Sequence, residues 1–304
     1  MSQNVRKTDL FLLRCLTNTH VGSGDTTYGV VDKIVQRDTI SELPVIHSSG
    51  LKGAFRELLA YKKNSSNPNE GHKHPSIVSI FGSVKDSDEI SSESGGDQEK
   101  EKEKKKNKEL TAGSHIFYEA HLLSLPVRNN VLPFFRATSR ERLLEMLGKV
   151  GLLISAEKRK ELEAQFQPLL DQSVQEGRPL VFNADTDATI YLENWKWEAC
   201  KINLPDIKKA EYILGDSLAL FNEYDFKSLC WELPVIARNR LDNGISKNLW
   251  YEEVVPRESL FYSFLSYPDD DGSFNLWTEL DGDCLIQVGG NATIGYGLCE
   301  ITKI

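Results

Sequence analysis

The stretch that decides the fold of this chain is THVGSGDTTYGVVDKIVQRDTISELPVIHSSGLKG, residues 19–53. An apolar run at residues 10–13 precedes it, and a segment with apolar residues at positions 51, 54, 55, 58 and 59 follows it. The run predicts a central strand over residues 9–17, and the later spacing predicts a helix that starts near Ser49. The loop between them is too long for a plain connector, and such loops inside a compact domain are usually functional.

The start of the predicted helix is a candidate phosphate site. Ser48 and Ser49 flank it and Lys52 lies in its first turn, where unpaired N–H groups and the positive end of the helix dipole attract anions. The alternative is that one serine merely caps the helix. Asp32, in the preceding loop, is either a turn-forming or salt-bridged residue or a catalytic carboxylate. These residues by themselves leave both questions open.

The composition is typical of a soluble globular protein. The 304 residues are 40% hydrophobic and 27% charged, and a chain of this length can bury a large core. The N-terminal residues lack the apolar core of a signal peptide, and no apolar run has the length of a membrane span. Five cysteines without a CxxC pair indicate a reducing compartment and argue against zinc. We therefore expect a cytoplasmic protein without a membrane partner.

One segment differs from the rest in composition. Residues 85–109 consist almost entirely of Lys, Glu, Asp, Ser, Gly, Gln and Asn, with Ile90 as the lone aliphatic residue. Such a segment cannot bury enough surface to offset the entropy lost on ordering, so it is predicted to be a disordered charged insertion. Its lysines could contact a polyanion, but interleaved glutamates nearly cancel their charge.

Several further elements follow from local patterns. Alternating apolar residues from position 116 to 122 predict a strand, and residues 138–147 read as a short helix. Ser155 can cap another helix, and residues 180–197 look rich in strand. Pro205 fits a helix start, and we expect that helix to run through residue 221.

The sequence Asp-Asn-Gly at residues 242–244 predicts the turn of a β-hairpin. Arg238 and Arg240, two apart, share one face of its first arm, and Trp250 and Tyr251 lie beyond the turn. Cations beside aromatic rings suit single-stranded nucleic acid, whereas a surface hairpin with a small aromatic cluster is the alternative. Because the net charge is -9, nucleic-acid binding would need such a local basic strip on an acidic body.

The C-terminal sequence CLIQVGGNATIGYGLCEITKI places four glycines, at positions 289, 290, 295 and 297, between two predicted strands. Glycines allow a backbone to approach another group closely. The order strand-loop-strand, without a following GK[ST], excludes a Rossmann or P-loop nucleotide site.

Together, four stretches resemble the RAMP superfamily and, within it, the backbone subunits of type III-B (Cmr) CRISPR effector complexes. They are HVGSG…GVVDKIVQRD…LPVIHSSGLKGAFR, IFYEAHLLSLPVR, ARNRL…LWYEEVVPRESLFY and GGNATIGYGL. The resemblance covers most of the chain outside the charged insertion and is weak between residues 147 and 227. It implies one α+β domain over residues 1–304, with a ferredoxin-like (RRM-like) palm, a helical insertion and a β-hairpin thumb over residues 234–264.

The resemblance also implies a function. Family members stack into a helical filament on guide CRISPR RNA, with other subunits of the complex, and cut complementary target RNA at regular intervals. The cleavage-essential aspartate maps to Asp32, which would also bind a divalent metal ion (Mg²⁺ or Mn²⁺), and the loop histidine maps to His20. The thumb contribution maps to Glu252, with Glu253 beside it as a second candidate, and both could be partners of Asp32 if the fold brings them close. One departure is Val254, where the family often has an aromatic residue.

The resemblance further implies an RNA-binding surface. Its expected residues are Gln36, Arg37, Ser48, Ser49, Lys52, Arg56, Arg128, Arg238, Arg240, Gly289, Gly290, Asn291, Gly295, Tyr296 and Gly297. Two alternatives stay open: a RAMP scaffold that binds RNA without cutting it, and a guide-processing RAMP endoribonuclease, for which His20 is the only well-placed imidazole.

Overall fold

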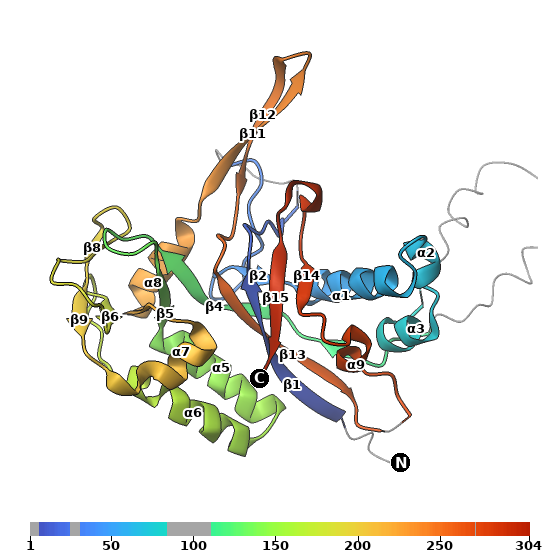
Figure 1. Cartoon of the computed structure of the whole chain (residues 1–304), viewed down its shortest axis with the longest axis horizontal. Coiled ribbons are helices and arrows are strands. Elements are labelled where there is room, and N and C mark those ends of the chain that lie inside the picture. The colour runs from blue at the N-terminus through green and yellow to red at the C-terminus, as the bar shows by residue number, and fades with distance from the viewer. Residues whose placement is uncertain (1–5, 25–30, 84–110, 271) are drawn as a thin grey trace, which may run out of the picture. The chain divides into compact units, whose positions relative to one another are not determined.

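The computed structural model in Figure 1 describes residues 6–24, 31–83, 111–270 and 272–304. The chain divides into two units. One comprises residues 1–7, 52–116 and 266–283, and the other comprises residues 8–51, 117–265 and 284–304. The disordered insertion predicted at residues 85–109 lies outside the described residues, as does Asp25 of the long loop.

A mixed sheet is the framework of the fold, and its strands follow the order β14-β15-β1-β13-β4-β5-β10-β6-β9. Two short strands join it off this path, where β2 pairs with β4 and β3 pairs with β13. The bounds are β1 Arg6–Cys15, β2 Val45–Ile46, β3 Ile116–Phe117, β4 Ala120–Val127, β5 Phe135–Ser139, β6 Leu180–Phe182, β9 Cys200–Ile202, β10 Leu218–Phe221, β13 Leu260–Pro268, β14 Leu285–Gln287 and β15 Leu298–Lys303. Strands and helices together confirm the predicted α+β class.

The first strand is central, as its apolar run predicts. β1 lies between β13 and β15 in the sheet, and residues 9–13 are buried because both of its faces are covered. It pairs antiparallel with β15, and Leu13 lies opposite Ile301. The C-terminal residues therefore complete the sheet beside the N-terminal strand, and the glycine-rich loop enters the sheet next to the end of β1.

Helices form most of the regular secondary structure outside the sheet. Ser139 caps α5 by accepting the N–H of Arg142, and Ser155 caps α6 by accepting the N–H of Lys158, which confirms the predicted cap. The apolar faces of these two helices meet in a core that includes Leu147 and Phe166. The bounds are α1 Ser48–Lys63, α2 Pro68–Gly71, α3 Pro75–Phe81, α5 Arg140–Leu153, α6 Ala156–Leu170, η2 Pro205–Ile207, α7 Lys208–Leu214, α8 Glu223–Trp231, α9 Leu276–Leu280 and η3 Ala292–Ile294.

The boundaries of two predicted helices are wrong. The helix expected over residues 138–147 begins only after β5 and extends to Leu153. The helix expected from Pro205 to residue 221 ends at Leu214, because Gly215 has a φ of 92° and breaks the helical path. Residues 218–221 then form β10, which is buried and parallel to β5. A short apolar run does not by itself distinguish a buried strand from a helix.

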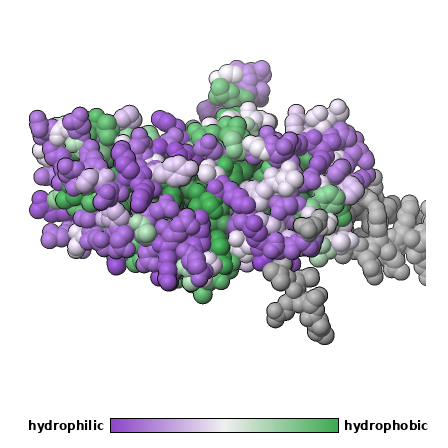
Figure 2. All heavy atoms as spheres, turned by 60° about the horizontal axis from the view of Figure 1, so that its bottom comes forward, coloured by the Kyte–Doolittle hydropathy of each residue, from purple (hydrophilic) through white to green (hydrophobic). Residues whose placement is uncertain are grey.

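The predicted hairpin forms a separate two-stranded sheet of β11 (Val235–Asp242) and β12 (Ile245–Glu253). Asn243 and Gly244 have φ values of 51° and 80°, as a type I′ turn requires. The hairpin is shorter than expected, since residues 260–264 belong to β13. It projects at the top of Figure 1, and Figure 2 shows that its exposed surface mixes apolar and polar side chains.

In the unit of residues 52–116 and 266–283, the end of α1 forms two ion pairs. Lys62 binds Asp283 at 2.8 Å and Lys63 binds Glu279 at 2.6 Å. Basic side chains in the last turn also complement the helix dipole. Among the described residues, no helix combines the length and the apolar character that a membrane crossing needs.

Candidate nucleic-acid interface

The loop that carries Asp32 runs along the base of the hairpin. The backbone N–H groups of Asp32 and Lys33 both donate to the carbonyl oxygen of Tyr251, each at 3.1 Å. The N–H of Tyr251 donates in return to Oδ2 of Asp32 at 2.7 Å, and the N–H of Glu253 donates to the carbonyl oxygen of Lys33. Asp32 is exposed, so these contacts hold its carboxylate at the protein surface beside β12.

His20 lies beneath the same strand. Its Nδ1 is 2.7 Å from the carbonyl oxygen of Glu253. A carbonyl oxygen can only accept, so Nδ1 donates this hydrogen bond. Nε2 faces Gly22, where an added Cβ would lie 3.0 Å from it. The ring is buried, and any larger residue at position 22 would crowd it.

Glu253 fixes the segment that follows Asp32. One of its carboxylate oxygens accepts from Arg37 at 2.6 Å and the other accepts the N–H of Val35 at 3.0 Å. Arg37 also donates to the carbonyl oxygen of Cys230 at 3.0 Å, and its guanidinium lies 5.3 Å from the ring of Trp231. The Arg37 side chain therefore connects the loop, the hairpin base and the end of α8.

Glu252 is buried in a ring of donors. Its carboxylate accepts from Nε1 of Trp250 at 2.7 Å, from Nε of Arg238 at 3.2 Å and from Nδ2 of Asn291 at 2.9 Å, and Lys33 lies at 3.6 Å. Burial opposes its ionisation, but the Trp250 hydrogen bond and the nearby positive charges outweigh burial and lower its pKa. An ionised Glu252 thus ties together the hairpin, the Asp32 loop and the glycine-rich loop.

The glycine-rich loop rests on the backbone of residues 18–20. Gly290 donates to the carbonyl oxygen of His20 and Gly297 donates to that of Asn18, both at 2.9 Å. Gly289 has a φ of 81°, and a Cβ there would collide with the His20 carbonyl oxygen. Part of the close approach that the glycines permit is therefore made to the protein itself. Tyr296 presents its ring to Arg238, whose guanidinium lies 5.1 Å away.

Residues far apart in the sequence thus meet at the hairpin base. Gln36 joins them through its side chain, which donates to the carbonyl oxygen of Gly22 and accepts the N–H of His47. We call this set the hairpin-base cluster: His20, Asp32, Lys33, Gln36, Arg37, Arg238, Trp250, Glu252, Glu253, Gly289, Gly290, Asn291, Tyr296 and Gly297. Arg240 lies further along the hairpin, on the face of Arg238, and is exposed.

The remaining sequence-predicted residues lie elsewhere. Arg128 donates to Glu193 through both Nε and Nη2, at 3.1 and 2.7 Å. Lys52 and Arg56 belong to the unit of residues 52–116 and 266–283, where Arg56 donates to the carbonyl oxygen of Gly82. Gly295 forms the end of η3 with open space around its Cα.

The start of α1 differs from the expectation. The helix begins at Ser48, and the carbonyl oxygen of His47 accepts the N–H of Leu51. His47 therefore occupies the cap position, and the interpretation of Ser48 or Ser49 as the cap is wrong. The His47 ring lies 2.9 Å from Glu119.

Trp231 is a part of this neighbourhood that the sequence did not predict. No spacing rule links residue 231 to residue 37, because the contact depends on where α8 packs. Glu253 is one of the two thumb glutamates that the family resemblance implies. Successive residues of a strand point to opposite sides, which is why these two glutamates serve different partners.

The described residues contain no group of three His, Cys, Asp or Glu side chains that could hold a metal ion. A protein-only metal centre therefore does not fit this part of the chain. Mg²⁺ is often bound by one or two carboxylates together with substrate phosphates and water. Asp32 offers one exposed carboxylate at the hairpin base, which is the number of protein ligands that this second arrangement can use.

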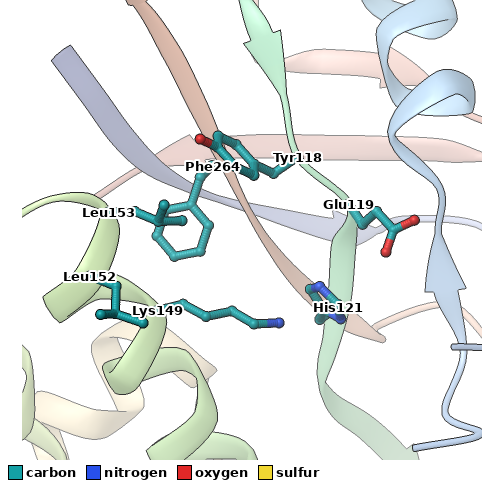
Figure 3. Close-up of a pocket in the computed structure, with 7 residues that line it drawn as sticks. All are labelled: Tyr118, Glu119, His121, Lys149, Leu152, Leu153 and Phe264. Carbon is teal, nitrogen blue, oxygen red and sulfur yellow. The ribbon is translucent and has the colours of Figure 1, made fainter. Parts of the chain in front are cut away.

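A cavity of about 270 Å³ lies apart from this cluster (Figure 3). Lys149 extends toward His121, and the carboxylate of Glu119 points away from the cavity. Burial and the charge of Lys149 lower the pKa of His121, so its ring is neutral at pH 7. The lining residues are Tyr118, Glu119, His121, Lys149, Leu152, Leu153 and Phe264. None of them is among the sequence-predicted site residues.

A comparison with protein families identifies the class of protein to which this chain belongs. The RAMP superfamily matches residues 12–300, and this chain therefore belongs to the RAMP superfamily.

Particular relatives share nearly its whole length. The chain is 27% identical to the CRISPR system CMR subunit Cmr4 of Saccharolobus solfataricus, over 96% of this chain and 94% of that protein. It is 26% identical to the CRISPR system Cmr endoribonuclease Cmr4 of Pyrococcus furiosus, over 95% and 93% of the two chains.

Two solved structures share the fold. The first is a chain of the type III-B Cmr-beta complex bound to cognate target RNA, with a TM-score of 0.69 and 20% identity over 97% of this chain and 96% of that one. The second is oligomeric Cmr4 from Pyrococcus furiosus, with a TM-score of 0.63 and 21% identity over 98% of each chain.

Proposed function

We propose that this chain is the repeating backbone subunit of a type III-B CRISPR effector complex, which binds guide CRISPR RNA and cuts complementary target RNA. Two relatives named as Cmr subunits, aligned over nearly the full length, support the role. The observation that carries the proposal for the site is the attachment of the exposed Asp32 carboxylate to the base of a hairpin that bears Arg238 and Arg240. Copies of the chain, other Cmr subunits and a cytoplasmic location are parts of the same proposal.

The strand order supports a ferredoxin-like palm. β1, β4, β13 and β15 would be the first, second, third and fourth strands of the palm in chain order. Across the sheet they follow the order β15-β1-β13-β4, which is fourth, first, third, second. That is the order of the four strands in a ferredoxin-like sheet. The hairpin of β11 and β12 would be the thumb, and the helices between β5 and β11 would be the helical insertion.

The proposed RNA surface begins at the hairpin base. Arg238 and the ring of Tyr296 lie beside the glycine-rich backbone, a combination of charge, ring and close backbone approach that suits a sugar–phosphate chain. Arg240 extends the same face of the hairpin. Lys52 would add a phosphate contact in the first turn of α1. Arg128 would have to share its guanidinium between Glu193 and RNA.

The proposed reaction uses the nucleophile that RNA already carries. The 2′-OH next to the scissile phosphate attacks phosphorus and gives up its proton, the P–O5′ bond breaks, and the leaving 5′ oxygen is protonated. Asp32 is the only exposed carboxylate in the hairpin-base cluster and would accept the 2′-OH proton or hold a shared divalent ion. Such an ion would neutralise phosphate charge at the reacting centre.

His20 and Glu252 have a different place in the proposal. Both side chains are buried, and their contacts reach the backbone of Glu253 and the side chain of Asn291. We assign them to positioning: His20 holds the end of β12, and Glu252 holds the glycine-rich loop against the hairpin. The exposed carboxylate of Asp32 then meets RNA on a preorganised surface.

The test is a cleavage assay on complexes assembled with guide RNA. Asp32→Asn should lower the cleavage rate by at least about 100-fold, the low end for a positioned acid–base group, and leave target affinity unchanged. A target with a 2′-deoxy sugar at the cut position should resist the wild-type protein, and chelation of divalent ions should stop cleavage. If Asp32→Asn cleaves the target as fast as the wild type does, Asp32 does not take part in cleavage. Tight binding without cutting by the wild type would indicate a scaffold.

A further inference from the structure

Helix α8 carries two large aromatic rings that the core does not use. Tyr224 is 71% exposed and Trp231 is 54% exposed. They are seven residues apart, so they lie on one face of the helix, and Lys227 lies between them on that face. Single exposed rings are common on protein surfaces, whereas two rings on one helix face form a patch that a ligand can cover.

A third exposed ring lies on a turn that is bonded to α8. Trp195 is 68% exposed and follows β7 (Tyr191–Leu192) in the turn before β8 (Trp197–Glu198), and its ring packs on Tyr191 with centroids 4.4 Å apart. The next residue, Lys196, donates to Ser228 at 2.9 Å and to Glu232 at 2.6 Å, at the C-terminal end of α8. Lys196 therefore fastens the turn that carries Trp195 to the C-terminal end of α8.

The turn holds Trp195 in an unfavourable backbone conformation. Glu193, Asn194 and Trp195 have φ values of 44°, 51° and 72°, three successive non-glycine residues in the left-handed region. Such residues persist only where the surrounding structure enforces them, and they gather at functional sites. Here Arg128 enforces the turn, because it binds the Glu193 carboxylate and accepts the Glu193 N–H at its carbonyl oxygen.

These rings continue the hairpin-base cluster. Trp231 lies 5.3 Å from the guanidinium of Arg37, and Arg37 binds Glu253, whose carbonyl oxygen holds His20. Two of the exposed rings have a cation close to them: Arg37 contacts the ring of Trp231, and Lys227 lies between Tyr224 and Trp231 on α8. Near the third ring, Lys196 follows Trp195 in sequence and lies over the ring of Trp197. Alternating rings and cations are how proteins bind single-stranded nucleic acid without reading its sequence.

We propose that Trp231, Tyr224 and Trp195 form a stacking surface for unpaired RNA bases, which leads away from the hairpin-base cluster past Arg37. The inference rests on the proposed function, since it extends the same RNA contact. Its ligand is single-stranded RNA of any sequence, because every base has a face that can stack on an aromatic ring.

The experiment measures binding of fluorescent oligouridylate by anisotropy, with the full chain at low salt. The test variant is the double substitution Trp195→Ala and Trp231→Ala, and the matched control is Tyr212→Ala, which removes a ring that is 86% exposed on α7. Each lost ring should weaken binding about 5-fold, the equivalent of ~1 kcal/mol, and the control should bind as the wild type does. An abasic RNA of equal length should bind the wild type and the double variant equally, since only stacking is removed.

Each other outcome overturns the inference. If the wild type binds no RNA, the proposed function fails together with it. If the wild type binds and the double variant binds equally well, only the stacking surface fails. Equal losses on abasic RNA would mean that Trp231 acts by holding Arg37 on a phosphate. Unchanged RNA affinity with a smaller assembly in sedimentation would identify the rings as a protein interface.

Discussion

Asp32 and Tyr251 exchange two hydrogen bonds although 219 residues separate them in the sequence. The Asp32 N–H donates to the Tyr251 carbonyl oxygen at 3.1 Å, and the Tyr251 N–H donates to the Asp32 carboxylate at 2.7 Å. The carboxylate that we propose for cleavage is therefore attached to a strand of the hairpin. Any displacement of β12 by RNA would also displace that carboxylate.

This attachment predicts different stabilities for two substitutions. Asp32→Asn keeps an oxygen that can accept the Tyr251 N–H, whereas Asp32→Ala loses the acceptor. We expect the free energy of unfolding to fall by about 0.5–1.5 kcal/mol more in Asp32→Ala than in Asp32→Asn, the usual net value of one hydrogen bond. Urea denaturation of both variants measures the difference. Equal stabilities would show that the bond to Tyr251 contributes nothing.

Replacing Glu252 should be costly. Glu252→Gln removes a buried negative charge that lies beside Arg238 and Lys33. We expect the free energy of unfolding to fall by about 1–3 kcal/mol. This is less than the full value for a buried ion pair because both cations reach solvent. The pKa of Glu252 is lowered in the folded state, so its stabilising charge is present above the unfolded pKa of about 4.5 and is lost as the pH falls further. The difference between wild type and variant should therefore shrink below pH 4.5 in denaturant titrations. Glu161→Gln, in an exposed pair with Lys158, should change stability little at any pH.

Two glycines of the C-terminal loop form a matched pair. Gly289 and Gly295 have φ values of 81° and 83°, so alanine brings a similar backbone penalty of about 1–2 kcal/mol at each position. Only Gly289 lies against the His20 carbonyl oxygen. Gly289→Ala should therefore lower the melting temperature more than Gly295→Ala and weaken RNA binding as well. Equal effects of the two substitutions would show that the approach to His20 is not needed.

The phosphate contact proposed for Lys52 predicts a change in salt dependence. Lys52→Gln should lower the slope of log affinity against log salt concentration by about 0.7, the value for one phosphate of a single strand. Affinity measurements on single-stranded RNA at several salt concentrations give this slope. Lys160→Gln removes an exposed lysine of α6 and should leave the slope unchanged. An unchanged slope for Lys52→Gln would show that Lys52 does not contact an RNA phosphate.

The stability of the unit that contains residues 52–116 should depend on mild acid through His115. Burial, together with the charge of Arg6, lowers the pKa of His115 to about 4, and its Nε2 accepts the N–H of Leu276 at 3.3 Å. The unfolded chain takes up this proton near pH 6.5, before the folded chain does. Stability should therefore fall by up to about 3 kcal/mol between pH 6.5 and pH 4. His115→Gln should be less pH-dependent over that range, and identical pH profiles would contradict the assignment.

Local sequence features predicted the parts of the fold that depend on neighbouring residues. The apolar run at residues 10–13 indicated a strand covered on both faces, and β1 is such a strand. Asp-Asn-Gly at residues 242–244 indicated a turn whose backbone only a few residue types adopt, and Asn243 and Gly244 adopt it. The prediction of helix through residue 221 is wrong because a buried strand of four apolar residues has no helical or alternating period.

The sequence by itself determined which residues are candidates for the chemistry, through the family resemblance that it carries: the aspartate of the long loop, the histidine at its start, the two glutamates at the end of β12 and the glycines near the C-terminus. Only the tertiary structure decided their environments. Asp32 is exposed, whereas Glu252 is buried among Trp250, Arg238 and Asn291. Both are acidic side chains. Burial and charge depend on the groups that long-range packing brings within a few ångströms, and no local pattern contains that information.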